Sequence, residues 1–226
     1  MSSRTLTTPP LVVRRSSHGE ELVNALTHGF GLLLSVSGAI LMAFALYSQV
    51  DPWRRIGCAV YVASLIAVYA TSTLSHSFAT PRWRSFFRSL DQGFIYLLIA
   101  ATYTPISLAY LRTGVWWGLL GAVWSIALYG FITKVFFAHR VEAVSIWSYI
   151  LLGWLPILSV PKLMTIVDSY NGFWLMLAGG LCYTVGTVFL ICDHKVRHFH
   201  ALWHLFVIAG STFHFLAILF FVAGTG

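Results

Sequence analysis

The chain has few charged residues. Asp, Glu, Lys and Arg make up only 9% of its 226 residues, whereas an ordinary soluble domain carries about 25%. Apolar residues make up 58% of the chain, and the mean hydropathy is +0.79. A chain of this length cannot bury so many apolar side chains inside one water-facing globule. The composition therefore excludes an ordinary soluble domain and favours a polytopic membrane protein.

Cysteine and acidic residues are also scarce. Cys58, Cys182 and Cys192 are odd in number and lack the spacing of a metal site or a disulfide framework. Seven acidic residues face fourteen Lys and Arg, for a net charge of +7. Because no basic run accompanies a base-reading motif, we expect these cations to border a membrane surface, with no nucleic-acid partner. No apolar core lies within the first 18 residues, so we expect no cleavable signal peptide.

Seven apolar stretches are each long enough to cross a hydrocarbon core of ~30 Å as a helix. They cover residues 22–47, 57–78, 90–111, 114–135, 143–161, 172–192 and 200–223. Short polar segments connect them, among them "SQVDPWRR" after the first stretch and "ATPRWRSFFRS" after the second. We therefore predict an all-α integral membrane protein, a bundle of seven transmembrane helices. Residues 19–226 would form the transmembrane domain, and residues 1–18 a cytoplasmic N-terminal arm.

Lys and Arg are unevenly divided between the two predicted sides of the membrane. One side would hold ten of them: Arg4, Arg14, Arg15, Arg82, Arg84, Arg88, Lys134, Arg140, Lys195 and Arg197. The other side would hold four: Arg54, Arg55, Arg112 and Lys162. Because Lys and Arg concentrate in cytoplasmic loops, this division predicts a cytoplasmic N-terminus and an external C-terminus. We expect the protein to lie in the cell's inner membrane.

Ionisable and polar side chains from four separate segments are predicted to gather at the cytoplasmic end of the bundle. They are Glu20, Asn24 and His28 at the start of the first span, Ser72 and His76 at the end of the second, Asp91 at the opening of the third, and His200 and His204 at the opening of the seventh. Ionisable residues inside a membrane span are costly, and they usually face the bundle interior and serve a site.

The seventh span carries two histidines at the spacing of a metal-binding helix. His200 and His204 are four residues apart, so both rings lie on one helical face. With His76 they would supply three imidazoles and leave one position open for water, as in a catalytic zinc site. Three imidazoles also suit iron, cobalt or nickel, although zinc is preferred here. A proton relay or a set of interhelical hydrogen bonds is the alternative interpretation.

Two further questions are which residue would act as the catalytic base and what His214 does. Ala201 follows His200, where the zinc-protease motif has a Glu, so a catalytic base would come from Asp91 or Glu20. His214 is ten residues beyond His204 and thus about 15 Å deeper along a helix, too far to share the same ion. We expect His214 to be a hydrogen-bonded core histidine.

Four motifs in order resemble those of the bacterial hemolysin III proteins, part of the progestin and adipoQ receptor superfamily. They are "ELVNALTHGFG", "STLSHSF", "LDQGFIYLLIAATYTP" and "HALWHLFVIAGSTFHF". This superfamily includes the adiponectin receptors and is distantly similar to alkaline ceramidases. The resemblance covers nearly the whole chain after about residue 18. Relative to the family pattern, the Ser72-to-Asp91 segment is shorter than in the animal receptors, and Gln92 stands where His or Tyr is commoner.

The resemblance implies a zinc ion near the cytoplasmic side, held by three histidines that match His76, His200 and His204. It also implies that Ser72 and Asp91 match a serine before the first ligand and an aspartate that contacts the zinc-bound water. Asp91 and Ser72 are accordingly the expected catalytic residues, and Zn²⁺ the expected cofactor.

The resemblance to ceramidases favours a zinc-dependent hydrolase of lipid amides or esters, with membrane lipids as partners and a long-chain lipid as substrate. An alternative is a non-catalytic sensor or regulator of lipid composition or membrane energetics, in which the zinc is structural. The family name suggests a third interpretation, a pore-forming cytolysin, which ranks last because seven predicted spans without an export signal do not suit a secreted protein. The oligomeric state is not predicted.

Overall fold

The computed structural model describes residues 16–137, 146–167 and 170–224. Within these residues seven helical segments are long and apolar enough to cross a membrane, which confirms the predicted all-α, seven-span architecture. Five spans are single helices: α1 (His18–Ala45), α2 (Pro52–Ser77), α3 (Pro81–Tyr110), α4 (Val115–Phe136) and α7 (Asn171–Cys192). The fifth span consists of α5 (Ile146–Trp154), η1 (Leu155–Ser159) and α6 (Val160–Leu163), and the last of α8 (Phe199–Ile218) and η2 (Leu219–Ala223).

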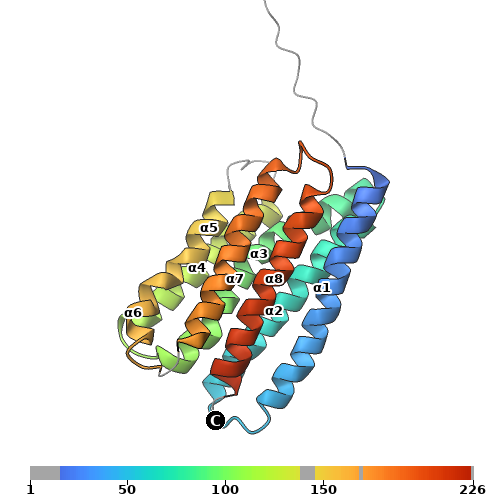
Figure 1. Ribbon diagram of the computed structural model, residues 1–226. Coiled ribbons are helices and arrows are strands. Elements are labelled where there is room, and N and C mark those ends of the chain that lie inside the picture. Colours follow the sequence, from blue (N-terminus) through green and yellow to red (C-terminus); the bar gives the residue numbers. More distant parts are fainter. Residues whose placement is uncertain (1–15, 138–145, 168–169, 225–226) are drawn as a thin grey trace, which may run out of the picture.

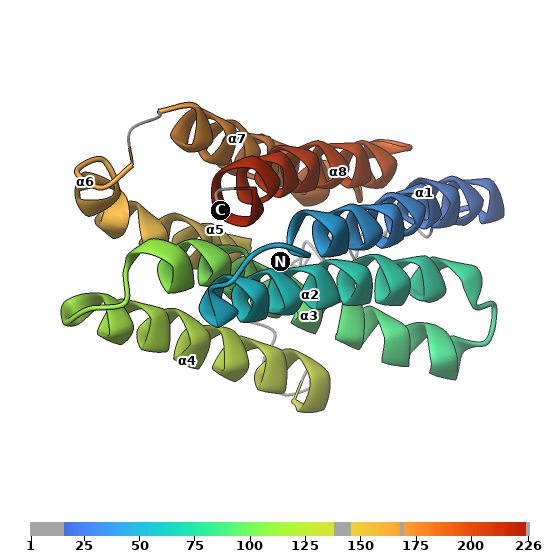
Figure 2. The same cartoon turned by 90° about the horizontal axis from the view of Figure 1, so that it is seen from below.

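The helices form one bundle, in which α3 is the most buried span (Figure 1). Helix α2 packs against α1 and α3, α3 against α4, and α8 against α7 and α1; Figure 2 shows this arrangement from below. We call the end at which α1 begins, α2 ends and α8 begins the histidine end. The C-terminus lies at the opposite end (Figure 1). Which end faces the cytoplasm stays a prediction.

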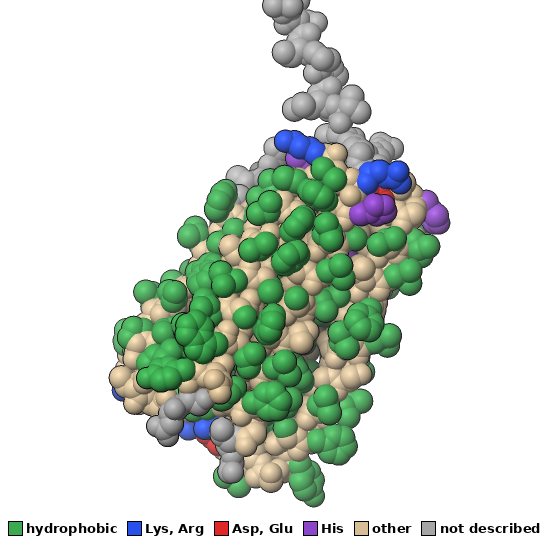
Figure 3. Space-filling view, in the orientation of Figure 1, with side chains coloured by type: hydrophobic (Ala, Val, Ile, Leu, Met, Phe, Trp, Pro, Cys, Tyr) green, Lys and Arg blue, Asp and Glu red, His purple; other side chains and the backbone are tan. Residues whose placement is uncertain are grey.

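The surface matches a bundle embedded in lipid. Apolar side chains cover much of the visible flank, charged side chains gather at the two ends, and the visible histidines lie toward the histidine end (Figure 3). Six of the ten cations assigned to the cytoplasmic side belong to described segments that meet at the histidine end: Arg82, Arg84, Arg88, Lys134, Lys195 and Arg197. Arg4, Arg14, Arg15, Arg140 and most of the predicted N-terminal arm lie outside the described residues.

Helices α2 and α3 start before the spans predicted for them. Helix α3 begins at Pro81, so most of the segment "ATPRWRSFFRS" is helical rather than a connection, and α2 begins at Pro52. Hydropathy marks only the part of a helix that is immersed in lipid, whereas Arg and Ser can continue its hydrogen bonding into water. Proline suits both starts because its missing N–H has no partner at the first helical position. Asp91 therefore lies inside α3, ten residues past its first residue, rather than at its opening.

Three prolines inside the predicted spans have different effects. Pro105 lies within the continuous helix α3, where Gly57 of α2 lets the two backbones approach: a Cβ at Gly57 would lie 2.7 Å from the Pro105 Cα. Pro156 lies where α5 gives way to the 3₁₀ turn η1, and Pro161 lies in the short helix α6. Proline lacks an N–H and its ring crowds the preceding turn, which explains the interrupted fifth span.

Candidate metal centre

Three histidines from two helices meet at the histidine end. His76 comes from the last turn of α2, and His200 and His204 come from the first two turns of α8. Each can offer a ring nitrogen, and the three ligand atoms lie within 4.8 Å of one another. His76 and His204 are buried, at 7% and 1% exposure, while His200 is half-buried. The structure thus brings together the three residues that the sequence proposed as metal ligands.

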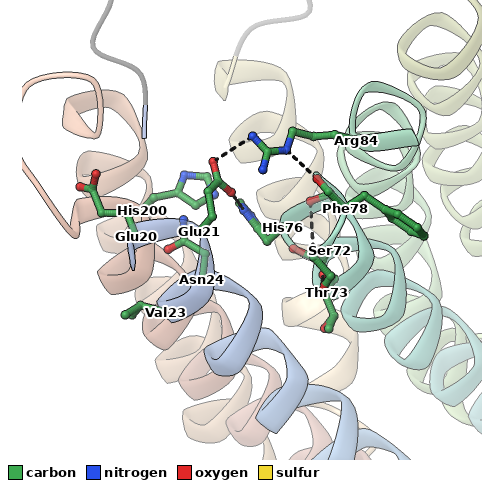
Figure 4. Close-up of polar contacts among 12 residues, drawn as sticks. Glu20, Glu21, Val23, Asn24, Ser72, Thr73, His76, Phe78, Arg84 and His200 are labelled. Atoms are coloured by element: carbon green, nitrogen blue, oxygen red, sulfur yellow. Dashed lines mark hydrogen bonds and ion pairs between the residues drawn. The ribbon is translucent and has the colours of Figure 1, made fainter. Parts of the chain in front are cut away.

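A carboxylate on α1 orients the first of these rings. The Nδ1 atom of His76 lies 2.8 Å from Oε2 of Glu21, which is itself buried, and Arg84 lies 3.8 Å from the other carboxylate oxygen (Figure 4). The Arg84 Nε–H also donates to the carbonyl of Phe78, which holds the guanidinium over the end of α2. An ionised carboxylate only accepts hydrogen bonds, so His76 donates from Nδ1–H and keeps the lone pair of Nε2 for another partner.

A second carboxylate orients His200 in the same way. Its Nδ1 lies 2.9 Å from Oδ2 of Asp193, seven residues earlier in the turn that joins α7 to α8. That turn reverses at His198, whose φ of 63° is the only positive value among the described non-glycine residues. The His198 N–H donates to Glu20 at 3.3 Å, which ties the turn to the start of α1.

His204 bonds to a hydroxyl group, and its ring also carries the proton on Nδ1. Its Nδ1 lies 3.0 Å from Oγ1 of Thr27. The Thr27 hydroxyl proton is within reach of two helix carbonyls, those of Val23 at 3.0 Å and Asn24 at 2.9 Å. Because a hydroxyl has only one proton and these carbonyls can accept it, we assign the His204 Nδ1–H as the donor to Thr27. All three rings therefore carry the proton on Nδ1, which leaves three Nε2 lone pairs for a shared partner.

This donor set fits zinc. Metal-binding histidines usually donate their second ring N–H to a carboxylate or another acceptor, which fixes both the tautomer and the ring orientation. In a tetrahedral site, Zn–N bonds of about 2.0–2.1 Å place the ligand nitrogens about 3.3–3.4 Å apart. Since the three atoms already lie within 4.8 Å, small side-chain movements suffice. His76, His200 and His204 would hold the ion.

The two predicted catalytic residues lie beside the histidines. Ser72, one turn before His76 on α2, has no exposed surface, and its hydroxyl makes no hydrogen bond of normal geometry among the described residues, with Asp91 as the side chain that approaches it. Asp91 of α3 lines the same cavity as Ser72 and the three histidines. His28 of α1 stacks on His204 with ring centroids 3.5 Å apart, and neither of its buried ring nitrogens has a partner in the described part of the chain.

The histidines open into a cavity of about 800 Å³ that continues through the bundle toward the opposite end. At the histidine end its lining is polar, and it includes Asp91, Arg88 and Lys134. Farther along, α3, the interrupted fifth span, α7 and α8 contribute mostly apolar side chains, among them Leu98 and Val207. The cavity thus combines a polar end next to the candidate metal ligands with a long apolar body.

The structure shows what Glu20 contacts and adds three residues. Glu20, considered a possible base, completes a capping box with Ser17 at the start of α1 and binds the α7–α8 turn. Its neighbour Glu21 orients His76, while Asp193 and Thr27 orient the other two rings. These pairings mostly join residues far apart in the chain, so spacing could not reveal them. The one local signal was Asp193, an acidic residue shortly before His200.

His214 is a hydrogen-bonded core histidine, as the sequence suggested. It is 9% exposed, and its Nε2 lies 3.0 Å from the carbonyl oxygen of Met176 on α7.

Comparisons with known proteins match most of the chain. The family described as "Haemolysin-III related" matches residues 17–215. The chain is 40% identical over 206 residues to "Hemolysin-3" of Bacillus cereus, covering 91% of this chain and 93% of that protein. It is 37% identical over 202 residues to the "Hemolysin-3 homolog" of Bacillus subtilis (strain 168), covering 89% and 94%. It is 29% identical over 208 residues to "Monocyte to macrophage differentiation factor" of Homo sapiens, covering 88% and 83%.

Proposed function

The chain belongs to the haemolysin-III related family of multi-pass membrane proteins, and we propose that it is a zinc-dependent hydrolase of lipid amides or esters in the cell's inner membrane. The observation that carries this proposal is that three adjacent histidines each have Nδ1 hydrogen-bonded to another side chain. This bonding leaves the Nε2 of each ring available for a metal ion. Three imidazole ligands leave a position for water, which is typical of a catalytic zinc site rather than a closed structural one.

The residues beside the histidines have the chemistry that hydrolysis requires. A bound Zn²⁺ supplies a Lewis acid and lowers the pKa of water toward neutrality. Asp91 lines the cavity at the histidine end, where its carboxylate can accept the proton of an attacking water. The buried hydroxyl of Ser72 can donate a hydrogen bond to the carbonyl oxygen of the substrate, which gains negative charge during the reaction.

The shape and lining of the cavity favour a long-chain lipid as substrate. The polar linkage of the lipid would lie between the three histidines and Asp91, and the hydrocarbon chain would follow the apolar body of the cavity. Membrane lipids are thus both the surroundings of the protein and its proposed source of substrate.

One observation favours a second candidate, a sensor in which zinc is structural. The three rings and their outer partners come from α1, α2, α8 and the α7–α8 turn, so an ion there would tie these segments together. The two candidates differ at Asp91, which a structural zinc does not need.

The test is turnover by the purified protein on ceramides and phospholipids, with chelator and after zinc is restored. We expect zinc-dependent release of fatty acid, lost in His204→Ala and reduced by about 10²–10⁴-fold in Asp91→Asn. His18→Ala, an exposed histidine at the start of α1, is the matched control and should leave turnover unchanged. Turnover that survives in His204→Ala would sink the proposal. Full zinc content without turnover on any of these lipids would favour the sensor.

A further inference from the structure

A second polar site lies deep in the cavity, far from the three histidines. His214 of α8 lines the cavity ten residues beyond His204, which corresponds to about 15 Å along the helix. Its Cδ2 and Nε2 atoms lie against α7, because a Cβ added at Gly179 would sit 2.2 and 2.4 Å from them. Only glycine at this position admits the ring, so the ring is held tightly in one place.

The contact with α7 determines which hydrogen bond His214 can still make. The carbonyl of Met176 can only accept, so the Nε2–H of His214 donates to it at 3.0 Å. In the neutral ring, Nδ1 then carries a lone pair and no proton. This Nδ1 is buried, on the ring edge away from α7, and has no partner among the described residues. It therefore requires a donor that the described protein does not supply.

A matching group lies on the α3 wall of the same cavity. The hydroxyl of Tyr103 is buried and makes no hydrogen bond of normal geometry within the described ranges, although the side chains of Ser107 and Ser159 lie near it. Tyr103 is twelve residues beyond Asp91, about 18 Å along its helix, so its depth is within about one turn of that of His214. The lining near them includes the apolar Ile106 and Ala217 and the hydroxyl-bearing Ser159 and Tyr183. The His214 acceptor and the Tyr103 hydroxyl thus lie at a similar depth in the cavity, where a simple hydrocarbon chain would bond to neither.

We propose that the cavity binds a lipid whose hydrocarbon chain carries a hydroxyl group near its middle. That hydroxyl donates to Nδ1 of His214, and Tyr103 supplies a donor to its oxygen at the same depth. A hydroxyl suits this pair because it both donates and accepts. The inference rests on the proposed function only in placing the polar end of the lipid at the three histidines. A resident buried water, which can satisfy the same two groups, is the competing occupant.

The test compares three probes that differ by one hydroxyl: stearic acid, the stearic acid hydroxylated beside its carboxyl group, and the one hydroxylated near mid-chain. Their affinities for the zinc-loaded protein are measured by calorimetry in detergent. We expect the mid-chain probe to bind about tenfold more tightly than the other two. Tyr103→Phe, which removes only a hydroxyl, and His214→Phe should each reduce that preference. Tyr110→Phe is the matched control, since its hydroxyl already donates to the Phe221 carbonyl at the cavity wall.

Equal binding of all three probes by the unmodified protein would mean that water occupies the site, and the inference would be wrong. It would also be wrong if both Tyr103→Phe and His214→Phe kept the full preference. Zinc content and hydrolysis are measured in the same samples, which separates the two proposals. A mid-chain preference without turnover refutes the hydrolase alone, whereas turnover without that preference refutes only the deep site.

Discussion

The two ends of the bundle use similar polar residues for different purposes. At the opposite end, Asp51 caps α2 through the Trp53 N–H at 3.0 Å and pairs with Arg112 at 2.8 Å. Arg54 donates to the Val222 carbonyl at 2.9 Å and lies over the Tyr110 ring. These contacts close the ends of helices and join neighbouring segments. Their donors and acceptors are used within the protein.

At the histidine end, some buried polar atoms have hydrogen-bond partners and others have none. Each of three imidazoles has one nitrogen bonded to an outer partner and the other nitrogen available, and both His28 nitrogens lack a partner in the described residues. Buried polar atoms without partners are costly. We infer that the partners of Nδ1 hold the three rings in place for a further ligand, whereas the polar contacts at the opposite end stabilise the fold.

The largest expected effect comes from removing a ligand. His76→Ala should lose stoichiometric zinc, because two imidazoles hold the ion much less tightly than three, and the paired Glu21 carboxylate would be left buried without its ring. Elemental analysis of the purified protein measures this directly. Arg112→Gln at the opposite end should keep its zinc; if both variants lose it, the contrast between the two ends is false.

An intermediate effect is expected from an outer partner. Glu21→Gln should lower zinc affinity by about 10–100-fold, since an amide is a weaker acceptor for His76 Nδ1–H than a carboxylate. Competition with a chelator of known affinity gives the value. The neighbouring Glu20→Gln, which changes the α1 cap rather than a ring partner, should bind zinc nearly as well as the unmodified protein. Equal losses in the two variants would contradict the role assigned to Glu21.

The smallest effect is expected from the structural end. Asp51→Ala removes the α2 cap and a partly exposed ion pair, and should lower the free energy of unfolding by about 0.5–2 kcal/mol. Asp51→Asn keeps a capping side chain and should lose less. Unfolding in a detergent titration measures both variants, and their zinc content should match that of the unmodified protein. A zinc loss in Asp51→Ala would show that the two ends are coupled.

The candidate ligands were predictable because their spacing and depth carry the signal. His200 and His204 share a helical face by their separation of four, and alternating spans bring His76 to the same end. The choice between Glu20 and Glu21 was not predictable. Adjacent residues on a helix point about 100° apart, so the exact rotation of α1 against α2 decides which carboxylate meets His76. The start of α3 at Pro81 was missed for another reason, since hydropathy reports immersion in lipid rather than helix length.

Sequence alone determined that this chain is a seven-span helical membrane protein with three histidines near one end. Length and hydropathy suffice for this, because lipid tolerates only backbones that satisfy their own hydrogen bonds. Only the tertiary structure decided which nitrogen of each ring is bonded to the protein. It also decided that His214 lines the cavity with an Nδ1 that has no partner among the described residues. Those properties depend on contacts between helices that are distant in the chain. If a helix turned about its axis by the angle between adjacent residues, a different side chain would meet the partner.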